Sequence, residues 1–359
     1  MNVFDENSEK FLYEYLNNNS PTGFEAPGQK LWVEYIKPFV DTWQLDHYGT
    51  VYGIINPDHP YKVVIEAHAD EISWFVNFIT DQGFIHVIRN GGSDHAIAPS
   101  MRVNIHTSKG KIKGVFGWPA IHTRKGKDEN LAPNMENIFI DVGAKSKQEV
   151  LEMGIHVGCV VTFQDELMLL NNTYYTGRAL DNRLGGFCIA QVARKIKENN
   201  ITLPFGLYIV NSVQEEIGLR GAEMIANTIK PNVAIVTDVT HDSSTPLVNN
   251  KIEGDIKCGE GPSLTYAPAV HNILLQHIID AAEKNNIPFQ RAASSRSTGT
   301  DTDAFAYSNG GIPSALISIP LRYMHTTVEM AHKQDIEHVI ELIYQSVLAL
   351  EPNQNFKYF

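Results

Sequence analysis

Residues 205–222 read FGLYIVNSVQEEIGLRGA, an apolar run followed by two adjacent acids, Glu215 and Glu216. The run at residues 205–210 predicts a buried strand, and residues 211–213 carry the chain out of it. Adjacent carboxylates repel each other and are costly to bury unless something neutralises them. A metal ion does this well, since one carboxylate binds it while its neighbour stays free as a general base. Taken alone, a Glu-Glu pair is more typical of a solvated acidic turn.

Strands and helices alternate along most of the chain around this stretch. Hydrophobic periodicity predicts helices at residues 7–16 and 28–36, and strand–helix alternation after about residue 175. This order favours a three-layer α/β/α domain with a mostly parallel sheet. The expected strands of that sheet are at residues 63–67, 205–210, 233–237, 289–293 and 314–319, and the later helices are at residues 183–197, 219–229, 271–285 and 333–350.

Residues 71–170 have a different sequence pattern. Short apolar runs and glycine-rich turns dominate, and helical periodicity is limited to residues 147–153. We therefore expect an inserted β-rich domain, barrel-like or PDZ-like, within an α/β domain made of residues 1–70 and 171–359. Its strands are expected at residues 74–79, 84–88, 101–106, 111–118 and 159–163, and a polar, charged loop is expected at residues 120–133.

Polar residues follow the predicted strands of the α/β domain. In an open α/β sheet, ligands bind at the carboxyl ends of the strands. Each residue alone has an ordinary explanation, such as a helix N-cap for an aspartate or a hydrogen-bonded core histidine. The convergence of two histidines and three carboxylates on one edge is harder to explain in that way. These five residues are His68, Asp181, Glu216, Asp238 and His325.

Such a mixed set of nitrogen and oxygen donors suits zinc, cobalt or manganese. If one carboxylate bridges, five residues can hold two metal ions, which activate a water molecule and polarise a carbonyl in hydrolytic enzymes. Asp70, two residues after His68, is placed to orient that imidazole as a hydrogen-bond acceptor. Glu215 is the natural base for the water and the later acid for a leaving amine. The ordinary alternative for Glu215 is a supporting or solvated acid.

Composition argues against several other classes of function. The net charge of −12 argues against nucleic acid as the main partner. Cys159, Cys188 and Cys258 are widely spaced and odd in number, which is typical of reduced thiols and not of a disulfide framework. The first residues, MNVFDENSEKF, have no basic region followed by an apolar core, so we expect no secretory signal. No apolar run approaches the roughly 20 residues that span a bilayer. We expect a soluble, cytoplasmic protein that does not contact membranes.

Six stretches of the chain carry a family resemblance. They are HADEI at 68–72, LDNR at 180–183, QEEIGLRGA at 214–222, DVTHD at 238–242, TGTDTDA at 298–304 and RYMHT at 322–326. In this order they resemble the M42 metallo-aminopeptidases, which include the glutamyl and TET aminopeptidases and are often labelled cellulases or endoglucanases. The resemblance covers nearly the whole chain. It implies an enzyme that removes N-terminal residues from peptides.

The resemblance also implies cofactors, residue roles and an assembly. It implies two divalent metal ions, most typically zinc or cobalt, with Glu215 as the base and Asp70 supporting His68. The inserted β domain would serve oligomerisation, with a dodecamer as the expected homo-oligomer. The residues implied around one ion are His68, Asp181 and Asp238, and those around the other are Asp181, Glu216 and His325.

The sequence departs from the family pattern at a few places. Ser73 stands where glycine is usual, and Ala69 where methionine or a similar residue is common, but neither position is a ligand. Residues 120–133 are unusually charged, and GEGP at residues 259–262 departs from a more usual basic or glycine pattern. These departures bear on substrate preference and assembly.

Other functions stay open at this point. An amidohydrolase or carboxypeptidase could use the same metal cage on another small amide. A glycosidase would need two carboxylates that flank a sugar, not carboxylates used as metal ligands. A non-catalytic scaffold of the same fold would be marked by a missing ligand or base, and none is missing here.

Overall fold

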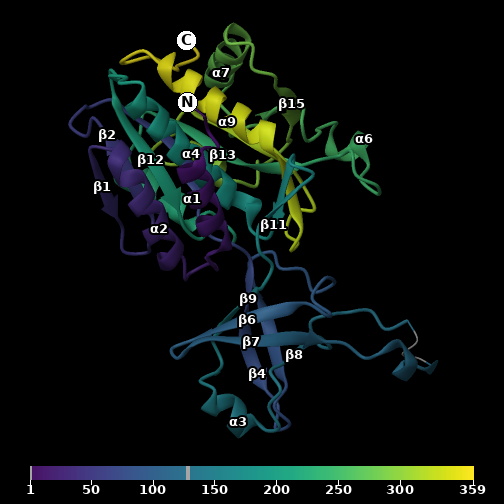
Figure 1. Cartoon of the computed structure of the whole chain (residues 1–359). Coiled ribbons are helices and arrows are strands. Elements are labelled where there is room, and N and C mark those ends of the chain that lie inside the picture. The colour runs from purple at the N-terminus through teal and green to yellow at the C-terminus, as the bar shows by residue number, and fades with distance from the viewer. Residues whose placement is uncertain (1, 127–129) are drawn as a thin grey trace.

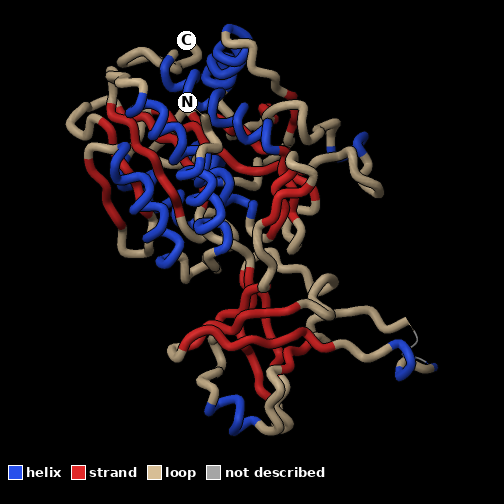
Figure 2. Tube along the Cα trace, in the orientation of Figure 1, coloured by secondary structure: helices blue, strands red, loops and turns tan. Residues whose placement is uncertain are grey.

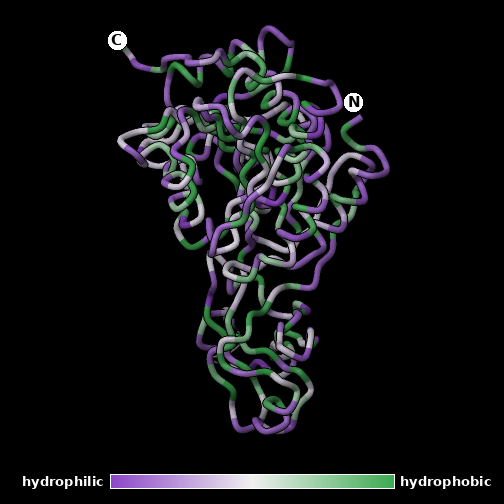
Figure 3. Tube along the Cα trace, turned by 90° about the vertical axis from the view of Figure 1, so that its left-hand side faces the viewer, coloured by the Kyte–Doolittle hydropathy of each residue, from purple (hydrophilic) through white to green (hydrophobic). Residues whose placement is uncertain are grey.

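The computed structural model describes residues 2–126 and 130–359. Figure 1 shows a large α/β body, which carries both chain ends, and a smaller barrel of strands that projects from it. In the view turned by 90°, the α/β body is broad and narrows toward the barrel (Figure 3). No helix in the described ranges is long and apolar enough to cross a membrane. The cytoplasmic location stays a prediction.

The α/β body is built on one large sheet. Its strands are β1 (Thr42–Leu45), β2 (Val51–Ile55), β3 (Lys62–His68), β10 (Met168–Leu170), β11 (Tyr174–Gly177), β12 (Gly206–Ser212), β13 (Val233–His241), β14 (Ser263–Tyr266), β15 (Gln290–Ala293), β16 (Ser314–Arg322) and β17 (Glu329–His332). They run in the order β1-β2-β12-β3-β13-β16-β17-β11-β10, with β14 beside β16 and β15 beside β14. The central strands β12, β3, β13 and β16 are parallel and almost wholly buried, as strands covered on both faces must be. Antiparallel strands flank this parallel centre on both sides.

Helices cover both faces of the sheet (Figure 2). They are α1 (Glu6–Asn17), α2 (Ala26–Ile36), α4 (Leu180–Glu198), α5 (Arg220–Ile229), α6 (Asn250–Glu253), α7 (Asn272–Lys284), α8 (Asp301–Ala306) and α9 (Lys333–Leu348). On one face, α4 packs on β3 and β13, and α1, α2 and α9 pack around α4. Helices α5 and α8 pack together against β12, β13 and β16. The predicted three-layer α/β architecture is confirmed.

The barrel is made of strands between residues 73 and 163. These are β4 (Ser73–Ile79), β5 (Ile85–Asn90), β6 (Arg102–Thr107), β7 (Gly110–Gly117), β8 (Phe139–Asp141) and β9 (Val160–Phe163), closed in the order β4-β5-β8-β7-β6-β9, with helix α3 (Lys147–Glu152) beside them. Its core, around Trp74, Phe116 and Phe163, is separate from the core of the α/β body. Residues 127–129 of the expected charged loop lie outside the described residues.

Several short elements escaped the sequence prediction because they are too short for periodicity to register. Strand β8 completes the barrel, and β10, β11 and β17 extend the large sheet. Strand β10 pairs with β11 in the large sheet although it lies within residues 71–170. The division into domains at residues 70 and 170 stays a prediction. Cys159 and Cys188 are buried, Cys258 is partly buried, and all three are free thiols.

Candidate functional site

The predicted site residues come together at the carboxyl ends of the parallel strands. Strand β3 ends at His68, β13 contains Asp238, and α4 begins with Leu180 and Asp181. Glu215 and Glu216 lie in the segment after β12, and His325 lies in the turn after β16. All six side chains line one cleft of about 620 Å³. Strand β13 continues through Asp238 to His241, whereas the sequence predicted that the strand would end just before Asp238.

Asp181 lies between the two histidines. Its Oδ1 is 3.3 Å from His68 Nε2, and its Oδ2 is 3.1 Å from His325 Nε2. Each oxygen of one buried carboxylate therefore faces a different imidazole. This is the arrangement that a bridging ligand between two metal ions requires.

Two groups of possible ligands share Asp181. One is His68, Asp181 and Asp238, the other is Asp181, Glu216 and His325, and within each group the ligand atoms lie within 4.8 Å of one another. Ligands about 2.0–2.1 Å from a tetrahedral zinc ion stand roughly 3.3–3.4 Å apart. The His325 Nε2–Glu216 Oε1 distance is 3.5 Å, and His68 Nε2–Asp238 Oδ1 is 3.9 Å. Both groups have the size and the donor types for a divalent ion.

Burial makes the charges at this site interdependent. It raises the pKa of Glu215 to about 10 and raises the pKa of Asp238 well above its usual range. Burial also acts to raise the pKa of Asp181, but hydrogen bonds with His325 and His68 hold that pKa below its usual range. For His325, burial is outweighed by hydrogen bonds with Asp181 and Glu216, and the pKa rises to about 11. Positive charge placed among these carboxyl groups would favour their ionised forms, so the donor set fits metal cations.

Asp70 connects the first histidine to the two glutamates. Its Oδ1 is 3.4 Å from His68 Nδ1, and that ring nitrogen has no hydrogen bond of good geometry with any described residue. The same carboxylate accepts the backbone N–H groups of Glu215 at 3.0 Å and of Glu216 at 3.2 Å. It also accepts the hydroxyl of Thr22 at 2.8 Å. Asp70 thus fixes the segment that carries both acids as well as facing the imidazole.

Left-handed backbone recurs next to the candidate ligands. The φ angles of Ala179, Gln214 and His325 are 56°, 59° and 61°. Residues with a Cβ adopt this conformation at a cost, and it persists only where surrounding contacts enforce it. Such strained positions are typical of sites where side-chain direction matters more than stability.

The barrel also contributes to the wall of the site. Gly92, in the loop after β5, lines the cleft beside His325. A Cβ on Gly92 would lie 2.6 Å from His325 Nδ1, so the absence of a side chain lets the two approach. The neighbouring Gly91 has φ of 80° and packs against Glu216.

Sequence reasoning assigned no role to several buried acids around the site, although Asp301 lies in the quoted stretch at residues 298–304. Ser212 Oγ lies 2.6 Å from Glu66 Oε1 and 2.8 Å from Asp301 Oδ2, and burial raises the pKa of both carboxyl groups. Glu66 interrupts the apolar run of β3, which was a usable signal. Glu329 also lies against the site and left no comparable signal.

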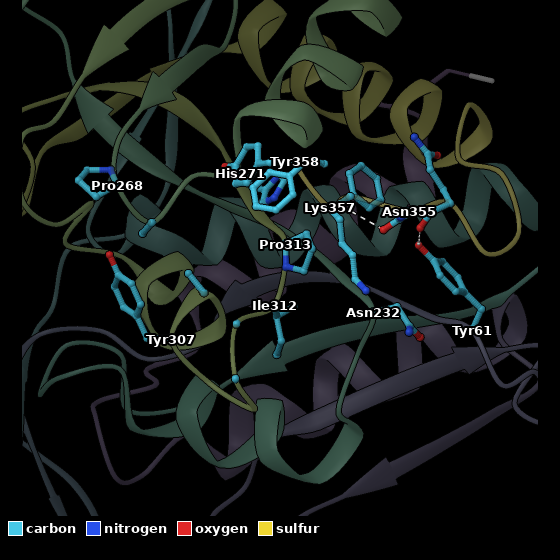
Figure 4. Close-up of a pocket in the computed structure, with 17 residues that line it drawn as sticks. Tyr61, Asn232, Pro268, His271, Tyr307, Ile312, Pro313, Asn355, Lys357 and Tyr358 are labelled. Carbon is cyan, nitrogen blue, oxygen red and sulfur yellow. Dashed lines mark hydrogen bonds between the residues drawn. The ribbon is translucent and has the colours of Figure 1, made fainter.

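A second hollow of about 740 Å³ lies at the opposite ends of the same strands (Figure 4). Its walls include Tyr61, Asn232 and Pro313, which directly precede β3, β13 and β16. His271 stacks on Tyr358 there, with ring centroids 4.5 Å apart. Among its described lining residues, His271 is the sole histidine, cysteine or acid. The hollow therefore has no group of ligands like those in the smaller cleft.

Comparison with known proteins gives consistent results. The sequence profile described as M42 glutamyl aminopeptidase matches residues 49–342. Lysyl aminopeptidase from Pyrococcus furiosus is 33% identical over 345 residues, which cover 96% of this chain and 97% of that protein. The TET aminopeptidase of a Thaumarchaeota archaeon from marine sediment has a TM-score of 0.90 and 28% identity, covering 95% of this chain and 96% of that one. The Pyrococcus horikoshii TET1 peptidase, which can assemble into a tetrahedron or a large octahedral shell, has a TM-score of 0.83 and 28% identity, covering 96% and 99%.

Proposed function

Because the chain belongs to the M42 glutamyl aminopeptidase family and is a peptidase, we propose that it removes N-terminal residues from peptides with the help of two divalent metal ions. The observation that carries this proposal is Asp181, whose two oxygens face His68 and His325 at 3.3 and 3.1 Å. His68 and Asp238 would complete the ligands of one ion, and Glu216 and His325 those of the other. Both groups share Asp181, which would bridge the two ions.

The residues divide the work of hydrolysis between them. When bound, the metal ions would polarise the peptide carbonyl and lower the pKa of a water molecule. Glu215 Oε2 lies 3.9 Å from His68 Nε2, at the edge of the first group, where it can take the proton of that water and pass it to the leaving amine. Positive charge nearby would lower the raised pKa of Glu215 and make it a base at neutral pH. Asp70 keeps the segment that carries Glu215 in place through the backbone N–H.

A panel of aminoacyl-p-nitroanilides tests this proposal. Acidic, basic, aliphatic and aromatic N-terminal residues should be compared before and after chelation, with zinc, cobalt and manganese added back. We expect at least one substrate to be cleaved, the activity to vanish on chelation, and metal to restore it. Absence of metal-dependent turnover on the whole panel would overturn the proposal.

A variant at the base tests the role of Glu215 separately. Glu215→Gln removes the proton acceptor but keeps the shape of the side chain. We expect kcat to fall by about 10²–10⁴-fold while the metal content stays that of the unsubstituted enzyme. Full activity in a variant that retains its metal would refute this role.

We also propose that the chain forms a homo-oligomer, a dodecamer by resemblance, through the barrel of the predicted insert. Support comes from exposed apolar side chains on the barrel strands: Phe78, Ile88 and Val115 are 55%, 45% and 44% exposed. Exposed apolar groups of this kind are typical of interfaces when they cluster. Light scattering coupled to size-exclusion chromatography gives the test. A monomer at micromolar concentration would contradict the proposal, and Phe78→Asp should shift an assembly toward smaller species.

A further inference from the structure

Glu329 is a buried carboxylate that touches the backbone of two candidate ligands. It is 2% exposed and is the first residue of β17. Its Oε1 accepts the backbone N–H of His325 at 2.7 Å, and its Oε2 accepts that of Asp181 at 3.1 Å. Each oxygen therefore holds a different ligand, and the two ligands belong to the same group.

Both N–H groups belong to irregular backbone. His325 has a φ of 61°, in the left-handed region. Asp181 has a φ of −75° and a ψ of 112°, outside the helical geometry of α4. Buried N–H groups need a partner, and left-handed backbone such as that of His325 persists only where specific contacts hold it. Glu329 supplies such a contact to both residues at once.

Glu329 is itself fixed by the sheet. In the ladder between β17 and β11, it stands opposite Gly177, the last residue of β11. The chain runs from Gly177 into Asp181, and from His325 forward into Glu329. The carboxylate therefore lies where the two ligand-bearing segments leave the sheet. Because Glu329 is part of a strand, its position is better defined than the positions of residues in those irregular segments.

We propose that Glu329 is a positioning residue for the group of Asp181, Glu216 and His325. It sets the spacing of Asp181 and His325, whose facing atoms are 3.1 Å apart, so that both side chains reach one metal ion. This inference rests on the proposed function, because a bound ion is what requires that spacing. Substitution of residues that support ligands in this way lowers metal affinity by about 10- to 100-fold.

Asp335 provides a matched control. It is 0% exposed, and its two oxygens accept the backbone N–H groups of Gly259 and Gly261 at 2.6 and 2.8 Å. Neither glycine lines the cleft. Glu329→Gln and Asp335→Asn make the same chemical change, since each places an NH₂ group against a backbone N–H. A merely structural role would give the same result for both variants.

The experiment is a titration of the metal-free protein with Co²⁺, followed by visible absorption and calorimetry without substrate. For Glu329→Gln we expect the affinity for one of two equivalents to fall by about 10- to 100-fold, with a changed absorption spectrum. Asp335→Asn should keep both affinities and the spectrum. Glu329→Asp keeps both oxygens on a shorter side chain, so its metal affinity should lie between those of Glu329→Gln and the unsubstituted protein. It replaces Glu329→Gln in the test if that variant does not fold. Metal affinities in the Glu329 variants equal to those of the unsubstituted protein, or equal losses in Asp335→Asn, would overturn the inference.

A second background shows whether Glu329 acts through His325. In the His325→Ala background, adding Glu329→Gln should lower metal affinity by less than it does in the unsubstituted protein. The reason is that the imidazole of His325, which Glu329 positions, has already been removed. Full additivity would contradict the mechanism. The two proposals fail differently: a protein that binds two Co²⁺ ions but cleaves no peptide refutes the proposed function alone. A metal-dependent aminopeptidase whose Glu329 variants bind metal normally refutes the positioning role alone.

Discussion

Gly92→Ala should weaken metal binding by one of the two ligand groups, although no candidate ligand is substituted. The φ of Gly92 is not in the left-handed region, so alanine is not forced into that strained conformation there. The added Cβ would lie 2.6 Å from His325 Nδ1 and 2.8 Å from Cε1. An ordinary contact is about 3.4 Å, so the ring must retreat by about 0.8 Å. Metal–ligand distances tolerate only about 0.2 Å, and a displaced His325 is therefore a poor ligand.

Equilibrium dialysis against buffered zinc measures this effect. We expect Gly92→Ala to bind one zinc ion about as the unsubstituted protein does and the other about 10- to 100-fold more weakly, by analogy with other supporting positions. Aminopeptidase activity should fall at limiting zinc and recover in part when zinc is in excess.

Gly114→Ala is the control for crowding in the barrel. Its Cβ would lie 2.9 Å from Ile140 Cγ2, a comparable clash that is remote from the cleft. This variant should lose stability and keep both zinc affinities. If Gly92→Ala binds both zinc ions normally, then the barrel loop does not fix His325, and the reasoning is wrong.

Three further predictions concern the role of Asp70 in metal binding, the pH dependence of stability, and the stability of the barrel. Asp70→Asn should weaken metal binding by about 10-fold or more, measured by competition with a chromophoric chelator, because an amide cannot accept hydrogen bonds on both sides; unchanged affinity would count against it. Burial and then the charge of Asp70 raise the pKa of Glu25 from its usual 4.5 to about 8. Between these values the folded chain binds more protons than the unfolded chain, so stability falls as pH rises, by at most about 5 kcal/mol. Glu25→Gln should remove that slope in urea denaturation at several pH values, and an unchanged slope would refute the assignment. Trp74→Ala should cost the barrel about 3–5 kcal/mol, since Trp74 is fully buried, and a smaller change in thermal or urea unfolding would contradict the described core.

Much of the site could be predicted because it depends on one general rule. Parallel strands of an α/β sheet present their carboxyl ends at a common edge, and His68 and the Glu215–Glu216 pair follow two apolar runs that local patterns reveal. The approach of these residues to Asp181 then follows from the topology. The roles of individual residues as ligands or base remain predictions, whereas their proximity is a structural result.

Glu329 could not be found in this way. Its partner Asp181 is 148 residues away in sequence, and the contact depends on the pairing of the short strands β11 and β17. Four-residue strands leave no periodic signal, and their antiparallel pairing is set by the tertiary fold. For the same reason, the approach of Gly92 to His325 depends on how the barrel meets the α/β body. Local sequence patterns do not encode it.

Anomalous diffraction from crystals grown with zinc tests the central claim most directly. Data collected just above and just below the zinc absorption edge should give two peaks per chain in the cleft. One peak should lie among His68, Asp181 and Asp238, and the other among Asp181, Glu216 and His325, with one oxygen of Asp181 on each ion. No peak in the cleft, or a single peak that Asp181 does not contact, would contradict the account.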